Sequence, residues 1–333
     1  MESIRHWQLF LNIYKMKFFT PVKGISEGEN KIEISSEIFL SGSCFADRMA
    51  DKLNYFRFNT RANPFGVIFH PVALANLYTR ALNDQFFDHN DVFQNNGLWQ
   101  SYWAHSSFSS VDREALIEQL NLQLKDIKKG MLESTHLVFT FGTAWGYTLI
   151  KNQQLVANCH KMPAACFEKK LSPPNEIVRL WKSLIQDISS RNSKLTVLLT
   201  VSPIRHLKDG LIQNSQSKAN LLTAVHQLVD QFGCCDYFPA FEIMMDELRD
   251  YRFYDKDLIH PSSEAVDHIW DQFSTTWLDP GLDTYLKEIH QLNRKLAHRH
   301  LHPESEQAKA FDRQLETQIE QLKSRYPHLK NLE

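Results

Sequence analysis

The chain has 333 residues, of which 43% are hydrophobic and 23% charged, as is typical of an ordinary soluble globular protein. Its 37 Lys and Arg against 39 Asp and Glu give a net charge of −2, which argues against binding to nucleic acid or an anionic membrane surface. The cysteines are scattered and two are adjacent, which argues against a disulfide framework. Since no apolar run is long enough to cross a membrane, the sequence predicts a cytoplasmic protein.

The first fifteen residues contain a short apolar stretch, Trp7–Leu11, that lacks the cleavage pattern of a secretory signal. Met16 is itself a plausible start, so we interpret residues 1–15 as a candidate dispensable extension.

Apolar segments with the character of strands recur at wide intervals: Ile38–Leu40, Leu137–Phe141, Leu195–Val201 and, more weakly, Tyr237–Phe238. Apolar residues at helical spacing lie between them, in residues 46–53, 115–127 and 177–185. Strands separated by helices of this length indicate βαβ units and a parallel sheet. The right-handed crossover rule then predicts helices on both faces of that sheet.

Two segments depart from this rhythm. Residues 83–110 are rich in Phe, Asn, His, Trp and Ser and are interpreted as an aromatic insertion, in which Trp99 and Trp103 are expected to pack and His105 is an open candidate for the site. Beyond Pro280 the pattern is helical, with two apolar stripes separated at Pro303. The sequence thus predicts a domain over 17–280 and, over 281–333, a helical hairpin that packs on the domain or joins two copies of the chain.

A candidate nucleophile, Ser43, follows the first strand and precedes a helix. In an α/β sheet, reactive groups stand at the carboxyl ends of strands, where the first N–H groups of the next helix favour an oxyanion. Two alternatives stay open: Ser43 is merely the N-cap of the helix, or Cys44 is the nucleophile. Side chains of adjacent helical residues point about 100° apart, so only one of the two faces the site.

Asp257 and His260 are candidates for the orienting acid and the base. A spacing of three places both side chains on one side of a turn. The carboxylate then accepts from one imidazole nitrogen while the other faces Ser43, as in a Ser, His and Asp triad.

Several segments now resemble one known family. Gly42-Ser43-Cys44-Phe45-Ala46 is the string that names the GSCFA family, and further segments resemble it: 63–67, 142–145, 158–161, 202–206, 237–242 and 257–261. The family in turn resembles SGNH or GDSL-type esterases, which implies an α/β fold of three layers, a flavodoxin-like parallel sheet.

The resemblance also implies roles for residues. Ser43, Asp257 and His260 correspond to the catalytic residues, and the N–H of Gly66 to one oxyanion donor. Two departures stand out. Ser41-Gly42-Ser43 replaces the Gly-Asp-Ser signature, and Gly142-Thr143-Ala144-Trp145 puts Ala144 where the oxyanion asparagine belongs. One such donor is worth about 100- to 1000-fold in rate. Either another donor replaces it, with Asn63, Asn158 and His160 as candidates, or the chain is a poor esterase.

The segment Asn158-Cys159-His160-Lys161 admits three interpretations: a polar wall of the site, a Cys and His nucleophile pair, or a metal site. The last is disfavoured because no partner at metal-ligand spacing accompanies it. His206 follows the third strand and is either a cleft residue or a loop histidine bonded to backbone.

We therefore expect an ester hydrolase that needs no cofactor and no metal, and that acts on a small or carbohydrate O-acyl ester. Transfer of the acyl group to an acceptor hydroxyl, and a non-catalytic binding module on the same fold, are the alternatives.

Overall fold

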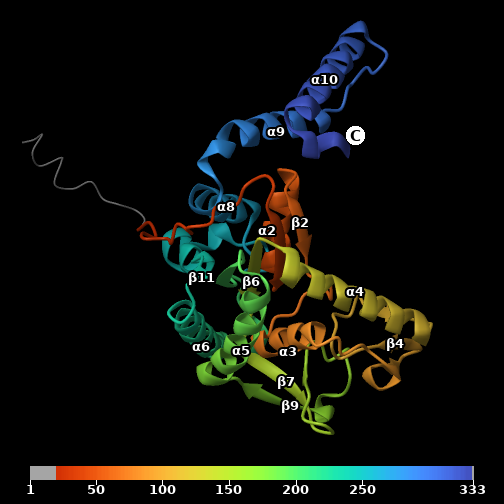
Figure 1. Cartoon of the computed structure of the whole chain (residues 1–333), viewed down its shortest axis with the longest axis vertical. Coiled ribbons are helices and arrows are strands. Elements are labelled where there is room, and N and C mark those ends of the chain that lie inside the picture. The colour runs from red at the N-terminus through yellow and green to blue at the C-terminus, as the bar shows by residue number, and fades with distance from the viewer. Residues whose placement is uncertain (1–19, 332–333) are drawn as a thin grey trace, which may run out of the picture.

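The computed structural model describes residues 20–331, and the proposed extension at residues 1–15 lies outside them. Its centre is a five-stranded parallel sheet in the order β11-β10-β6-β1-β2. Figure 1 labels β11, β6 and β2 of this sheet. The strands are β1 (Glu37–Gly42), β2 (Asn59–Ala62), β6 (His136–Phe141), β10 (Thr196–Val201) and β11 (Cys235–Tyr237). The predicted parallel sheet is confirmed, whereas β2 was not predicted because its residues, Asn-Thr-Arg-Ala, are mostly polar and carry no apolar pattern.

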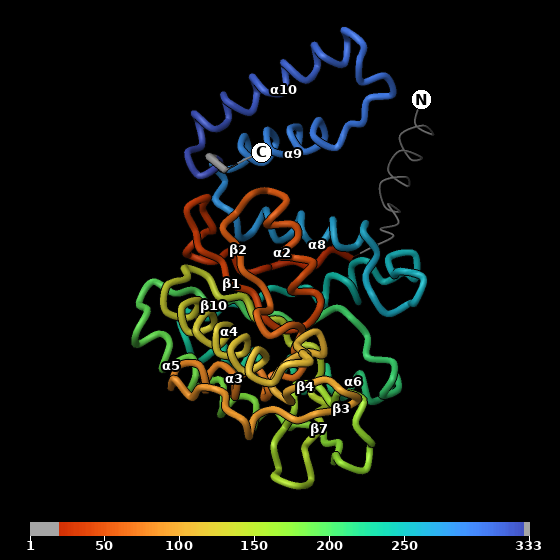
Figure 2. Tube along the Cα trace, turned by 90° about the vertical axis from the view of Figure 1, so that its right-hand side faces the viewer, coloured from red at the N-terminus to blue at the C-terminus, as the bar shows by residue number. Residues whose placement is uncertain are grey.

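Successive side chains of the central strands enter opposite cores. Phe39, Leu137 and Leu199 pack on one face, and Ile38, Leu40 and Val138 on the other. Figure 2 shows α2 (Cys44–Tyr55) and α8 (Ser263–Trp277) on one side of the sheet. The other side is covered by α3 (Pro71–Leu82), α4 (Arg113–Glu133), α5 (Pro174–Arg191) and α6 (Leu211–Val229). The three-layer α/β fold is confirmed, because a strand buried on both faces needs helices on each.

Two small antiparallel sheets lie outside the parallel sheet. The insertion forms β3 (Phe93–Asn95), β4 (Leu98–Gln100) and β5 (Ser109–Ser110). The segment after β6 forms β7 (Trp145–Leu149), β8 (Leu155–Val156) and β9 (Phe167–Leu171), an excursion that the sequence did not predict. Trp99 and Trp103 pack against the main core, as expected.

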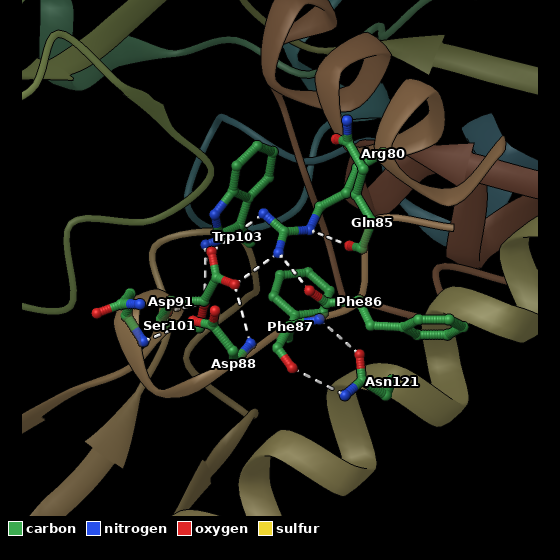
Figure 3. Close-up of polar contacts among 10 residues, drawn as sticks. Arg80, Gln85, Phe86, Phe87, Asp88, Asp91, Ser101, Trp103 and Asn121 are labelled. Atoms are coloured by element: carbon green, nitrogen blue, oxygen red, sulfur yellow. Dashed lines mark hydrogen bonds and ion pairs between the residues drawn. The ribbon is translucent and has the colours of Figure 1, made fainter. Parts of the chain in front are cut away.

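The insertion is fastened to α3 by the guanidinium of Arg80 (Figure 3). It donates to the backbone oxygens of Gln85 and Phe86 and forms a two-pronged ion pair with Asp91. The same group lies 4.1 Å from the ring centre of Phe87. One cation therefore holds the start of the insertion at three points.

The C-terminal residues form α9 (Asp283–Leu296) and α10 (Glu306–Arg325), with the break near Pro303 that the sequence predicts. The hairpin lies at the opposite end of the molecule from β7 in both views (Figures 1 and 2). Tyr285 of α9 donates to the backbone oxygen of Phe56, and Asn293 donates to that of Tyr55. The hairpin thus packs on the end of α2. None of the helices described between residues 20 and 331 is both long and apolar enough to cross a membrane.

Candidate active site

The turn from β1 into α2 is built on a glycine. Gly42 has φ +133°, and a Cβ there would lie 2.1 Å from the backbone oxygen of Thr140 on β6. Only glycine tolerates both that conformation and that approach. Ser43 follows as the N-cap, and its backbone N–H donates to the same Thr140 oxygen at 3.0 Å. The start of α2 is therefore fixed at the carboxyl edge of the sheet.

Ser43 takes the N-cap role that the sequence left open. Its Oγ accepts from the N–H of Phe45 at 3.3 Å, and its side chain is fully buried. This contact satisfies one of the unpaired donors in the first turn of the helix.

His260 and Asp257 form the predicted pair. Asp257 Oδ2 accepts from His260 Nδ1 at 2.6 Å, and its Oδ1 accepts from the backbone N–H groups of Ile259 and His260. These bonds, the ring bond first, lower the pKa of Asp257 to about 2. The carboxylate is thus ionised at neutral pH and favours a proton on Nδ1, the tautomer in which Nε2 is an acceptor.

The free nitrogen of His260 faces Cys44. The distance from Nε2 to Cys44 Sγ is 3.7 Å, a sulfur hydrogen-bond distance. This corrects the expectation that the second imidazole nitrogen faces Ser43. The physical reason is the one anticipated for adjacent helical residues: with Ser43 turned inward to cap α2, the next side chain points to the loop that carries His260.

The pKa of the Cys44 thiol is raised above its ordinary value, although its surroundings act in both directions. Burial raises its pKa most, its own backbone N–H lowers it, Asp47 raises it, and Arg48 and Lys218 lower it. The N–H of Cys44 is at the first position of the helix, where no intrahelical acceptor exists. It therefore lies where it can support negative charge on or next to the sulfur.

The predicted oxyanion donors on the β2 side are used elsewhere. The N–H of Gly66 donates to the backbone oxygen of Asn63 at 2.7 Å. The Asn63 side chain accepts from the N–H of Gly42 and donates to Asp47. Both residues therefore shape the loop after β2, and the expectation that they donate to an oxyanion is wrong for this arrangement.

The turn after β6 is also saturated. The N–H groups of Gly142 and Thr143 donate to the backbone oxygen of Phe69, and the N–H of Ala144 donates to Ser217 Oγ at 2.7 Å. His70, the buried N-cap of α3, donates from Nε2 to the Ala144 oxygen at 3.0 Å. This turn supplies no donor in place of the asparagine that Ala144 replaces.

The predicted site residues His105, Asn158 and His160 lie in the insertion and in the β7 excursion. His105 contacts Ser107 and Gly66, while His160 donates to the backbone oxygen of Ser101, and Asn158 accepts from the N–H of His160. These contacts tie them to the insertion and the β7 excursion, so the expectation that Asn158 or His160 serves as the oxyanion donor is not supported.

His206, beyond β10, is nearer the chemistry. Burial is the largest cause that lowers the pKa of His206 to about 4; positive charge on Lys218 and His260 acts in the same direction, and Asp209 opposes it. Its Nε2 is buried and has no hydrogen-bond partner among the described residues.

Over residues 20–331 the structure assembles no group of three His, Cys, Asp or Glu suited to a metal ion.

Sequence comparison now identifies the family. The GSCFA family model matches residues 37–273, and that of the GSCFA domain protein, C-terminal domain, matches residues 289–333. The chain therefore belongs to the GSCFA family. A comparison with curated proteins found no match.

Proposed function

We propose that this chain is an acyl-transfer enzyme that cleaves O-acyl esters through Cys44. The contact of Cys44 Sγ with His260 Nε2, backed by Asp257, is the observation that carries the proposal. A nucleophile, a base and a group that orients the base are the three parts that nucleophilic catalysis requires.

The reaction follows from these positions. His260 Nε2 takes the thiol proton, and the imidazolium is stabilised by Asp257. The sulfur of Cys44 attacks the acyl carbonyl, and the alcohol leaves with the proton from His260, so a thioester forms. Water, deprotonated by His260, then releases the acid and regenerates the thiol. No cofactor takes part in these steps.

A second alignment with the esterase signature, shifted by one residue, points to Cys44. Placing Gly42-Ser43-Cys44 on the Gly-Asp-Ser signature keeps the glycine in register and puts cysteine at the nucleophile position. A small O-acyl ester, including one on a carbohydrate, is the substrate class that we propose. An acceptor hydroxyl in place of water would give transfer.

The test follows the pre-steady-state reaction with p-nitrophenyl acetate in excess over the protein, and mass spectrometry maps the acetylated residue. We expect a burst of p-nitrophenolate and a hydroxylamine-sensitive acetyl group on Cys44. Cys44→Ala should abolish the burst, and His260→Ala should slow it by about 100- to 10,000-fold. Cys159→Ala, which removes another half-buried thiol, is the matched control and should leave it unchanged.

Ser43→Ala should keep the burst and lose only about 1 kcal/mol of stability, as an N-cap does. An acetyl group on Ser43 would return the role to serine. A folded wild-type protein that forms no acyl adduct would favour the non-catalytic binding module.

A further inference from the structure

Lys218 is a buried cation that the proposed reaction has not yet used. It lies on α6 with its side chain 2% exposed. Its Nζ donates to the backbone oxygens of Gly142 and Ser202, each at 2.7 Å. Among residues 20–331 no carboxylate forms an ion pair with it. Lysine is almost never fully buried unless it is paired, so this position calls for a compensating role.

The ammonium group lies at the edge of the sheet where α2 begins. Thr140 of β6 is in register with Gly42 of β1, so Gly142 and Cys44 each lie two residues beyond paired positions. Ser202 directly follows β10, the next strand. Lys218 therefore bridges the end of β6, which pairs with the nucleophile strand β1, and the end of β10, the strand beyond β6.

The electrostatic coupling runs between Lys218 and Cys44. The pKa of Lys218 is lowered to about 7 by burial, against the opposing effect of negative charge on Cys44. Reciprocally, Lys218 favours ionised Cys44. The Nζ of Lys218 also lies 5.8 Å from the ring centre of Phe241. Its charge opposes protonation of His206. A negative charge that forms on or next to Cys44 therefore stabilises the charged form of Lys218.

We propose that Lys218 supplies the positive charge that stabilises the oxyanion formed when Cys44 attacks an acyl group. This inference rests on the proposed function. Lys218 would take over the role of the oxyanion asparagine that Ala144 replaces, because it binds Gly142, the first residue of the same turn. Two of its three N–H donors bind backbone oxygens, so one remains for an oxyanion. A charge in a site that excludes water acts more strongly than one in solution, so a buried ammonium suits a transition state that gains negative charge.

The neighbouring residue supports this arrangement. Ser217 Oγ accepts from the N–H of Ala144 and contacts Thr143 Oγ1 at 3.0 Å. Consecutive residues of α6 therefore bind the same turn: Ser217 accepts from the N–H of Ala144, and Lys218 brings its ammonium to the oxygen of Gly142. Sequence reasoning missed Lys218, because nothing in the pattern of residues 211–229 marks this lysine as buried.

Two reactions of the same thiol separate an oxyanion role from a role in ionising Cys44. Acetylation by p-nitrophenyl acetate forms an oxyanion, whereas alkylation by iodoacetamide displaces iodide at carbon and forms none. Both rates are measured against pH and expressed per ionised thiol, for wild type, Lys218→Met and Lys218→Gln. Glutamine keeps a donor for the backbone oxygens but has no charge, which guards against a methionine variant that fails to fold.

We expect acetylation to fall by about 100- to 1000-fold in both variants, while alkylation of the ionised thiol changes far less. Equal losses in the two reactions would overturn the inference, because Lys218 would then act on the thiol or the fold. Unchanged acetylation would also overturn it and leave the proposed function intact. A wild-type protein that alkylates at Cys44 but is not acetylated would instead remove the proposed function, and this inference with it.

Discussion

Replacing Arg80 with methionine should release the insertion from α3. The ion pair with Asp91 is mostly buried, with the Arg80 and Asp91 side chains 12% and 16% exposed. Methionine removes the cation from that carboxylate, which among the described residues keeps only the N–H of Asp88 as a donor, and removes the guanidinium donors from the backbone oxygens of Gln85 and Phe86 (Figure 3). Breaking a buried pair by removing one partner costs about 3–5 kcal/mol. Because some solvent reaches this pair, we expect a loss near the lower limit, about 3 kcal/mol.

Equilibrium unfolding in urea measures this loss. Lys129→Met is the matched control, since Lys129 pairs with Glu133 on the surface of α4 with both side chains more than half exposed. That pair should contribute less than about 0.5 kcal/mol. Arg80→Lys should fall between them, because one ammonium cannot reproduce the planar fork of a guanidinium.

Limited proteolysis locates the effect, since cleavage within residues 83–110 should quicken in Arg80→Met ahead of cleavage elsewhere. The reasoning fails if Arg80→Met is as stable as Lys129→Met, for the buried pair would then contribute no more than an exposed one.

Two further predictions concern histidine burial and a glycine turn. Burial lowers the pKa of His70 to about 4, so the unfolded chain binds the extra proton and stability should be full above about pH 6.5 and fall as the pH drops towards 4, by up to about 3 kcal/mol. His70→Asn should flatten this part of the curve of unfolding free energy against pH; an unchanged slope would refute the assignment. Gly66→Ala should cost more than Gly97→Ala, because both glycines have positive φ but only the Cβ at 66 meets His105, at 2.4 Å. Thermal melts of the two variants check this, and equal losses of about 1–2 kcal/mol would mean that only backbone strain counts.

The sequence by itself determined the sheet and its layers. Strands buried on both faces are continuous apolar runs, as in Leu137–Phe141, and the helices between them show their apolar stripes. The pairing of Asp257 with the base His260 could also be predicted, because a spacing of three brings two side chains together within one turn. Local periodicity and short-range contacts decided these features.

Only the tertiary structure decided which residue faces the base and which charge lies beside it. The sequence does not distinguish Ser43 from Cys44 as the residue that faces His260. The direction in which α2 leaves β1 and the position of the loop that carries His260 decide it. Lys218 reaches the carboxyl edge of the sheet from a helix far along the chain, and its burial depends on strands that pair across that distance. The edge strand β2 was likewise hidden, since a polar strand is held by its pairing with β1 and not by an apolar pattern.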